Sequence, residues 1–237
     1  MTGAPRLSIV VPIHDEAESL PLLYRELTEV LKDTGGGVEF VLVDDGSADG
    51  SLGILRSLAR DDPRVRVVAL DGNHGQSAAL AAGFEKVRGE FTVMLDADLQ
   101  NDPADIPRML ARMDEADVVN GVRVDRHDGF VRRLSSRVGN GFRNWMTGES
   151  VTDVGCSLRV VRTSFLKRVR TFRGMHRFLP TLLRLEGARV IEIPVTHRPR
   201  RYGRSKYGIG NRLFIGLEDV FGVRWLQRRA LRWRERD

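Results

Sequence analysis

The stretch TVMLDADLQNDP, residues 92–103, carries an apolar run directly into a group of carboxylates. Residues 91–98 have the composition of a buried β-strand, and Pro103 suits the first turn of a helix expected to reach about residue 115. Asp96 and Asp98 are two positions apart, so an extended backbone would project both side chains to one side. Because like charges repel unless a cation lies among them, the stretch predicts a strand that ends at a functional site.

The alternation of strand and helix continues on both sides of this stretch. In the first half, further strands are expected at residues 7–13, 38–45, 65–70 and 117–123. Segments of helical periodicity separate them, which is typical of βα units and predicts an α/β fold with a mostly parallel, Rossmann-like sheet flanked by helices. The second half is less regular, with helices expected at 127–148 and 178–187 and strands at 154–161 and 188–195.

Polar and mostly acidic residues follow each of the first four predicted strands. They are His14, Asp15 and Glu16, then Asp44 and Asp45, then Asp71 and Asn73, and finally Asp96 and Asp98. In an open parallel sheet, ligands bind beyond the carboxyl ends of the strands. A single acidic end is usually a turn or a helix cap, but four ends at one edge indicate a site. Mg²⁺ or Mn²⁺ would relieve the repulsion and retain phosphate oxygens or water as ligands, so the pattern favours phosphate chemistry.

Charge is divided unevenly along the 237 residues. Residues 1–118 carry 11 Lys and Arg against 22 Asp and Glu, whereas residues 119–237 carry 27 against 10, so net charges of −11 and +17 combine to +6. The basic half fits nucleic acid, an anionic membrane or a solvated surface. Cys156 is the single cysteine, which excludes a disulfide within the chain and fits a reducing compartment. Neither a secretory leader nor an apolar run of about 18 residues is evident.

Four segments resemble a known family. IVVPIHDEAESL, LVDDGSADGS, GNHGQSAALAAGF and VMLDADLQNDP resemble, in this order and spacing, the nucleotide-sugar-binding half of the inverting family 2 glycosyltransferases, which have a GT-A fold. GVRVDRHDGFVRRLSSR, DVGCSLRVVR and HRPRRYGRSKYGIGNR resemble the branch that transfers sugar to a polyprenyl phosphate, including dolichyl-phosphate mannose synthases and their undecaprenyl-phosphate relatives. The resemblance covers about residues 6–212.

The resemblance implies a set of donor-binding residues. The base and ribose of a GDP- or UDP-linked sugar would contact Pro12, Asp15, Glu16 and Asp45. The metal ion, Mg²⁺ or Mn²⁺, would be held against the diphosphate by Asp96, Asp98 and Gln100. Arg204 and Lys206 resemble part of a mobile loop that closes over the diphosphate. Asp153 resembles a family acid close to the transferred sugar, with helix capping as the alternative.

The acceptor phosphate is expected to contact Arg123, Arg133, Ser136 and Arg137. Guanidinium groups match phosphate oxygens, and the last three residues have the spacing of one helix face. The alternative is a solvated basic face. Because a polyprenyl phosphate is itself an anionic nucleophile, no strong general base is required. Asp98, Arg123 and Arg133 are therefore the predicted catalytic residues.

The C-terminal segment is predicted to be helical and basic. We expect a GT-A domain at residues 1–207 and an amphipathic segment at 208–237, with Leu213, Leu217, Val220 and Phe221 on one stripe. Tryptophans beside arginines suit a helix in the lipid headgroup layer, which predicts peripheral association with the cytoplasmic face of the membrane. Packing on its own domain or on a partner subunit is the alternative, and a separate transmembrane partner or a second copy of the chain is a further candidate.

The predicted activity is metal-dependent transfer of a sugar, with inversion, from a nucleotide diphosphate sugar to a polyprenyl phosphate. One alternative is a family 2 transferase with a saccharide acceptor, which would need a catalytic base and leave the arginine cluster without a purpose. Another is a nucleotide or nucleic-acid binding protein, suggested by the pI near 10.1. Against it, no recognised nucleic-acid motif occurs, so no nucleic-acid partner is predicted.

Overall fold

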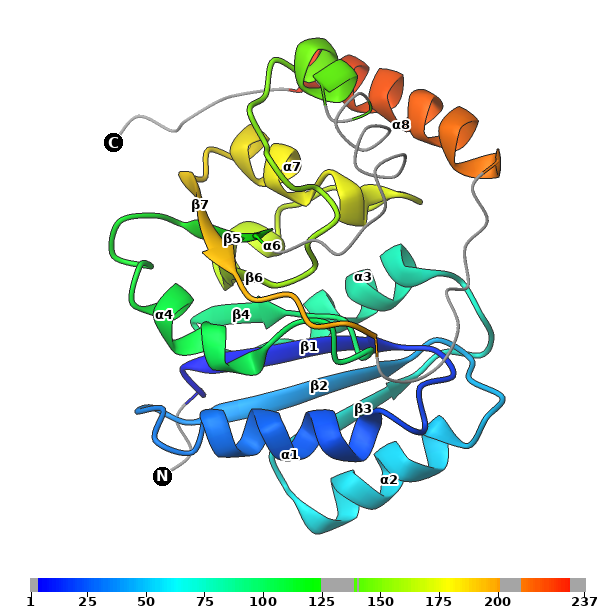
Figure 1. The fold of residues 1–237 in the computed structure, drawn as a ribbon, viewed down its shortest axis with the longest axis vertical. Helices are drawn as coiled ribbons and strands as arrows, with labels where there is room; N and C mark the ends of the chain where they lie inside the picture. The colour runs from blue at the N-terminus through cyan, green and yellow to red at the C-terminus, as the bar shows by residue number, and fades with distance from the viewer. Residues whose placement is uncertain (1–3, 125–138, 140, 201–209, 231–237) are drawn as a thin grey trace, which may run out of the picture. The chain divides into compact units, whose positions relative to one another are not determined.

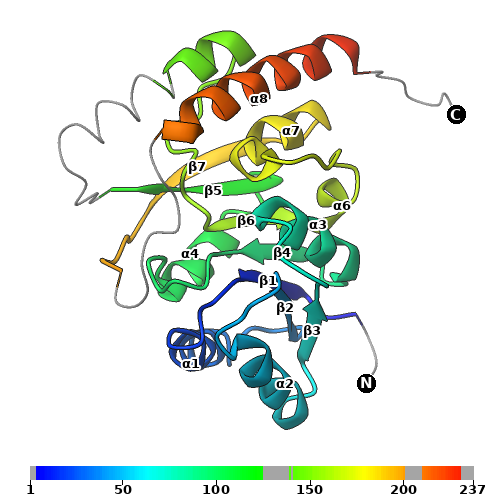
Figure 2. The ribbon, with the colours of Figure 1, turned by 90° about the vertical axis from the view of Figure 1, so that its right-hand side faces the viewer.

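The structure, a computed structural model, describes residues 4–124, 139, 141–200 and 210–230. Its described part contains one seven-stranded sheet with the order β3-β2-β1-β4-β6-β5-β7, which can be followed in Figures 1 and 2. The strands are β1 (Leu7–Ile13), β2 (Val38–Asp44), β3 (Val65–Ala69), β4 (Phe91–Met94), β5 (Val118–Arg123), β6 (Arg159–Arg162) and β7 (Val190–Val195).

Strand direction confirms the mostly parallel sheet. Strands β1, β2, β3 and β4 run parallel to one another, and β5 is parallel to β7. Strand β6 is antiparallel to both β4 and β5, which the sequence did not reveal. The carboxyl ends of β1, β2, β3 and β4 therefore meet at one edge of the sheet, where the sequence predicted a site.

The helices are α1 (Leu20–Val30), α2 (Ser51–Asp61), α3 (Gln76–Lys86), α4 (Ile106–Leu110), α6 (Thr163–Leu166), α7 (Leu179–Leu185) and α8 (Gly210–Arg229), with short 3₁₀ helices η1 (Pro103–Asp105) and η2 (Met175–Arg177). Several predicted elements are shorter than expected, among them the strand expected at 91–98, which ends at Met94. The helix expected to reach residue 115 consists of η1 and α4, and ends at Leu110. The strand expected at 154–161 starts only at Arg159, and the chain turns at residues 154–155, where Asp153 accepts a hydrogen bond from the Gly155 N–H.

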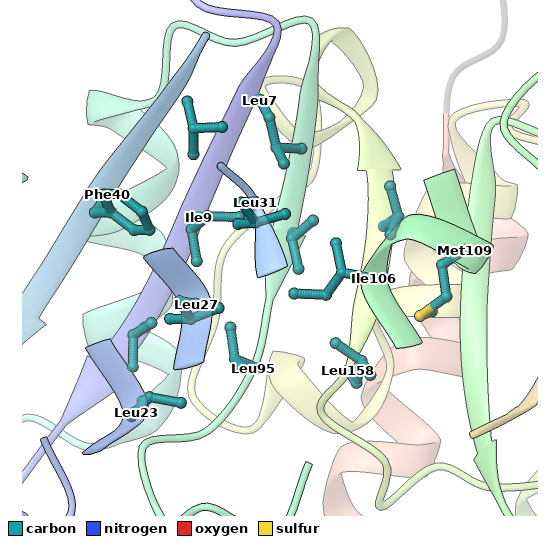
Figure 3. Close-up of a cluster of buried hydrophobic side chains, with 14 of the residues drawn as sticks. Leu7, Ile9, Leu23, Leu27, Leu31, Phe40, Leu95, Ile106, Met109 and Leu158 are labelled. Carbon is teal, nitrogen blue, oxygen red and sulfur yellow. The ribbon is translucent and has the colours of Figure 1, made fainter. Parts of the chain in front are cut away.

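Helices cover both faces of the sheet. On one face, Leu23 and Leu27 of α1 pack over inward-facing side chains of the strands, together with Leu31 directly after this helix and with Ile106 and Met109 of α4 (Figure 3). On the other face, α3 approaches so closely that a Cβ on Gly83 would lie 2.6 Å from Val10 Cγ1. The apolar spacing of these helices thus builds the core that fixes the strand ends.

The described residues form two compact units. One contains residues up to 124 together with 153–200; the other contains described residues of 139–152 together with 210–230. In the second unit, residues 141–147 are helical, and Gln227 Nε2 donates a hydrogen bond to the Thr147 carbonyl at 2.9 Å. The predicted domain boundary at residue 207 stays a prediction.

Helix α8 confirms a helical C-terminal segment, but the apolar residues predicted to share one face differ in their exposure. Val220 and Val223 are buried, whereas Phe221 is 58% exposed and Trp225 is 63% exposed. Leu213 and Leu217 fall among residues whose side chains lie outside the described part. No helix in that part has both the length and the apolar character needed to cross a bilayer.

Candidate active site

The carboxylates of the opening stretch lie on a tight turn directly after β4. The chain turns at Asp96 rather than continuing as a strand to Asp98, and Leu99 has a φ of +61°. Ser157 Oγ fixes the turn, since it accepts hydrogen bonds from the Asp96 N–H at 3.3 Å and from Asn101 Nδ2 at 2.7 Å. The Asp96 carboxylate also accepts a hydrogen bond from Gln76 Nε2 at 2.7 Å. Ser157 therefore holds the backbone of Asp96, and Gln76 of helix α3 holds its carboxylate.

Burial and a neighbouring carboxylate both affect the pKa of Asp96. Burial, followed by the neighbouring Asp98, raises the pKa of Asp96 to about 6, although Ser157, Arg159 and Arg123 act in the opposite direction. Asp98 is buried, and its Oδ2 lies 2.7 Å from the guanidinium NH2 of Arg200. The sequence predicted that a cation must lie among these carboxylates, and in the structure the cation in contact with Asp98 is an arginine.

The donor atoms at this turn fit a divalent cation that arrives with its ligand. Carboxylate oxygens suit Mg²⁺ and Mn²⁺, which retain water or phosphate oxygens in their coordination sphere. Within the described residues no three His, Cys, Asp or Glu side chains form a complete metal site. Asp96 and Asp98 could thus supply part of the coordination, and a diphosphate the rest.

Gln100, the third predicted metal ligand, is on the same loop. Its backbone N–H donates to Asp98 Oδ1 at 3.1 Å, and its side-chain Nε2 lies 3.5 Å from His197 Nε2. The structure therefore brings Gln100 close to Asp98, while its role as a ligand stays a prediction.

Asp45, which is predicted to contact the nucleotide sugar, is buried directly after β2. Its two carboxylate oxygens accept hydrogen bonds from the His74 and Gly75 N–H groups, at 2.8 and 2.9 Å, just before α3. Gly46, the residue after Asp45, has a φ of +67°, and a Cβ there would lie 2.4 Å from the Gly72 carbonyl carbon. Since Gln76 of α3 binds Asp96, the start of this helix links the ends of β2 and β4.

The end of β1 brings three further donor candidates to the same edge. Pro12 is in β1 opposite Val43. Asp15, with a φ of +49°, accepts a hydrogen bond from the Ala48 N–H at 2.7 Å and donates its own N–H to Ser47 Oγ. Glu16 Oε1 lies 3.9 Å from Arg200 NH1. Arg200 thus lies between the ends of β1 and β4.

Arg123, a predicted acceptor contact, lies at the end of β5 and forms a two-pronged ion pair with Asp153. The Nε–Oδ2 and NH2–Oδ1 distances are 2.7 and 2.8 Å. Asp153 is buried and also accepts the Gly155 N–H, so it orients Arg123 instead of capping a helix. The other acceptor candidates, Arg133, Ser136 and Arg137, and the loop candidates Arg204 and Lys206, lie outside the described residues.

Sequence reasoning missed several residues of this edge. Besides Arg200, Gln76 and Ser157, it missed Arg159, which is buried and donates to Asn120 Oδ1 at 2.6 Å and to the His176 and Val154 carbonyls at 3.2 Å. No local spacing marks a single arginine in a short strand. The neighbouring Cys156 is buried as expected, and burial raises the pKa of its thiol to about 11, which is unfavourable for a nucleophile.

A curated relative supports the family suggested by these residues. The chain is 42% identical over 205 residues to an undecaprenyl-phosphate 4-deoxy-4-formamido-L-arabinose transferase from Edwardsiella ictaluri. The aligned region is 86% of this chain and 63% of the relative, so the chain spans less than two thirds of that protein's length.

Solved structures support the fold. Glucosyl-3-phosphoglycerate synthase from Mycobacterium tuberculosis, with Mn²⁺, UDP-glucose and glycerol 3-phosphate, matches with a TM-score of 0.66, 17% identity and coverage of 97% of this chain and 82% of that chain. The mannosyltransferase PcManGT from Pyrobaculum calidifontis, with GDP-mannose and Mn²⁺, matches with a TM-score of 0.61, 19% identity and coverage of 99% and 67%. The predicted GT-A fold is thereby confirmed.

The sequence profile of one family extends over most of the chain. Residues 8–170 match glycosyl transferase family 2, and this range includes the turn at Asp96 and Asp98, the ends of β1 and β2, and the Arg123–Asp153 pair. The chain therefore belongs to glycosyl transferase family 2.

Proposed function

We propose that this protein transfers a sugar, with inversion, from a nucleotide diphosphate sugar to a polyprenyl phosphate in a reaction that depends on Mg²⁺ or Mn²⁺. The observation that carries the proposal is the 42% identity, over 86% of the chain, to a relative named as an undecaprenyl-phosphate sugar transferase. The product would be a lipid-linked monosaccharide.

For the donor, Asp96 and Asp98 would hold the metal ion together with Gln100, and Pro12, Asp15, Glu16 and Asp45 would contact the nucleoside. A divalent cation there would stabilise the charge of the departing nucleoside diphosphate. The turn at Asp96, held by Ser157 and Gln76, orients the carboxylates before the ligand arrives. Bound Mn²⁺ and nucleotide sugars in the two solved relatives support this assignment.

For the acceptor, Arg123 would bind the polyprenyl phosphate together with Arg133, Ser136 and Arg137. Asp153 fixes the Arg123 guanidinium through two short contacts, so this group has a defined orientation. The residues need to hold the phosphate oxygen in line with the anomeric carbon, and the phosphate supplies its own nucleophilic charge. Arg204 and Lys206 would contact the donor diphosphate.

The lipid acceptor lies in a membrane. We propose that the second unit binds the surface of this membrane from the cytoplasmic side. Trp145, Phe221 and Trp225 are exposed, and Arg224, Arg228 and Arg229 of α8 are exposed as well. Exposed aromatic and basic side chains suit the interface of an anionic bilayer. Co-sedimentation with vesicles of phosphatidylethanolamine and phosphatidylglycerol tests this assignment, and equal recovery in the absence of vesicles would contradict it.

The activity is tested by a screen of labelled UDP- and GDP-sugars with undecaprenyl phosphate and either Mg²⁺ or Mn²⁺. We expect label in an organic-extractable product for at least one donor, and none after metal chelation. A parallel reaction supplies oligosaccharide acceptors in place of the lipid. Label in the oligosaccharide but not in the lipid would replace the proposal with a saccharide-acceptor transferase.

A further inference from the structure

Arg200 holds the position at Asp98 that a divalent cation would need. Its NH2 lies 2.7 Å from Asp98 Oδ2, and its NH1 lies 3.9 Å from Glu16 Oε1. The other Asp98 oxygen, Oδ1, already accepts the Gln100 N–H. Arg200 is 30% exposed at its side chain and Asp98 only 10%, so the ion pair is largely removed from water. A metal ion that approaches Asp98 Oδ2 therefore meets a guanidinium already in contact with this oxygen.

The segment that carries Arg200 is attached to the loop that carries Asp98. Asn101 and His197 form an isolated β-bridge, and the Arg198 N–H donates to the Gln100 carbonyl at 2.8 Å. The Arg198 guanidinium also joins Asp102 and Glu26, each at 2.7 Å. These contacts anchor the backbone beside the turn, so the Arg200 side chain can leave Asp98 without the segment detaching.

We propose that Arg200 is the internal counter-ion of Asp98 in the metal-free protein and that it competes with the divalent cation for this carboxylate. A cation alone would then bind weakly, because it has to break a sheltered ion pair. A nucleotide diphosphate changes the balance, since its oxygens complete the metal coordination and offer the displaced guanidinium a new anionic partner. Metal and nucleotide therefore bind cooperatively, and Arg200 couples them.

This inference rests on the metal site of the proposed function, but its test does not need the transfer reaction. Free Mn²⁺ has an electron paramagnetic resonance signal that is lost on binding, so the full chain can be titrated with Mn²⁺ alone and with UDP or GDP. Blanks with nucleotide but no protein remove the contribution of Mn²⁺–nucleotide complexes. We expect Arg200→Gln to bind Mn²⁺ alone about three- to fivefold more tightly than the unaltered protein, the upper part of the range for loss of a partly exposed ion pair. The strengthening of Mn²⁺ binding by nucleotide should fall by the same factor.

Arg198→Gln is the matched control. It also removes one positive charge, two positions from Arg200, but the Arg198 side chain contacts Glu26 and Asp102 instead of Asp98. Its Mn²⁺ affinity should stay within about twofold of the unaltered protein. Equal gains in both variants, or no gain in Arg200→Gln, would overturn the competition. If Arg200→Gln folds poorly by circular dichroism, Arg200→Met replaces it and retains the apolar stem. Unchanged Mn²⁺ binding in Asp98→Asn would instead remove the metal site on which the proposed function depends.

Discussion

Buried carboxylates occupy both edges of the central sheet, but their surroundings are opposite. At the edge where β1 and β2 begin, Glu39 accepts hydrogen bonds from Ser8 Oγ at 2.6 Å, from the Arg88 N–H at 2.6 Å and from the Arg88 guanidinium at 2.8 Å. Burial alone would raise the pKa of Glu39, but these donors hold it below its usual value. At the edge where β4 ends, Asp96 has another carboxylate beside it and its pKa is raised.

Other acids at the first edge repeat the pattern of Glu39. Asp117, just before β5, accepts hydrogen bonds from the Arg189 N–H and guanidinium. Asp62, just before β3, is bound by the Arg64 guanidinium. Burial acts to raise the pKa of both acids and is the largest single cause at Asp117, but the hydrogen bonds and charge of the arginines lower each pKa below its usual value. A buried acid with sufficient hydrogen-bond donors therefore stabilises the fold, whereas a pair of carboxylates that repel each other retains affinity for a ligand cation.

The largest expected effect is in the Asp98→Asn variant. Asp98 lies at the edge where β1, β2, β3 and β4 end, which we call the ligand edge. Loss of one metal-binding charge should lower kcat/KM for sugar transfer at least about a thousandfold, roughly 4 kcal/mol in the transition-state free energy. The melting temperature should change little, because Asp96 is relieved of repulsion while the Arg200 pair is lost. Transfer assays and thermal melts measure the two effects. Full turnover in this variant would contradict the metal assignment at Asp98.

The opposite edge should respond in the opposite way to Glu39→Ala. Ser8 Oγ and the Arg88 N–H lose their acceptor in a buried location, so the free energy of unfolding should fall by about 3 kcal/mol. The folded variant should retain kcat/KM within about twofold. Urea unfolding followed by circular dichroism gives the first quantity and a transfer assay the second. A large loss of activity at unchanged stability would instead place Glu39 among the residues that act on the ligand.

The Arg123–Asp153 pair lies at the ligand edge, but its acid is bound by an arginine, as are the acids at the opposite edge. If Arg123 binds the acceptor phosphate, Arg123→Lys should lower kcat/KM for the polyprenyl phosphate about tenfold, or 1.4 kcal/mol, because lysine lacks the planar fork. The KM for the nucleotide sugar should be unaffected. Initial-rate kinetics with each substrate varied in turn separates the two. An equal change in both KM values, or lower stability alone, would give this pair a structural role.

The sequence predicted the ligand edge better than the edge opposite. Consecutive βα units place every carboxyl end on one side, so Asp45, Asp96 and Asp98 could be grouped from their positions after apolar runs. Glu39 gave no such signal, because a single acid in a strand does not reveal an arginine 49 residues away. Arg200 is 102 residues from Asp98, and no spacing rule links them. Local pattern thus predicts where functional groups gather, while long-range packing decides which of them are neutralised.

The smallest expected effect concerns Asp62, at the edge where the strands begin. The Arg64 guanidinium, followed by Tyr24 among the lowering contacts, brings the pKa of Asp62 from 3.8 to about 2. A lowered pKa in the folded state adds stability that is complete above the unfolded value near 4 and is lost as the pH falls from about 4 to about 2. Because the Arg64 side chain is 44% exposed, the contribution is only about 1 kcal/mol. The free energies of unfolding of the unaltered protein and of Asp62→Asn, measured with urea, should therefore differ at pH 7 and converge as the pH approaches about 2. A difference that does not vary with pH would mean that the Asp62 charge contributes nothing, and that acids at this edge are satisfied by hydrogen-bond geometry alone.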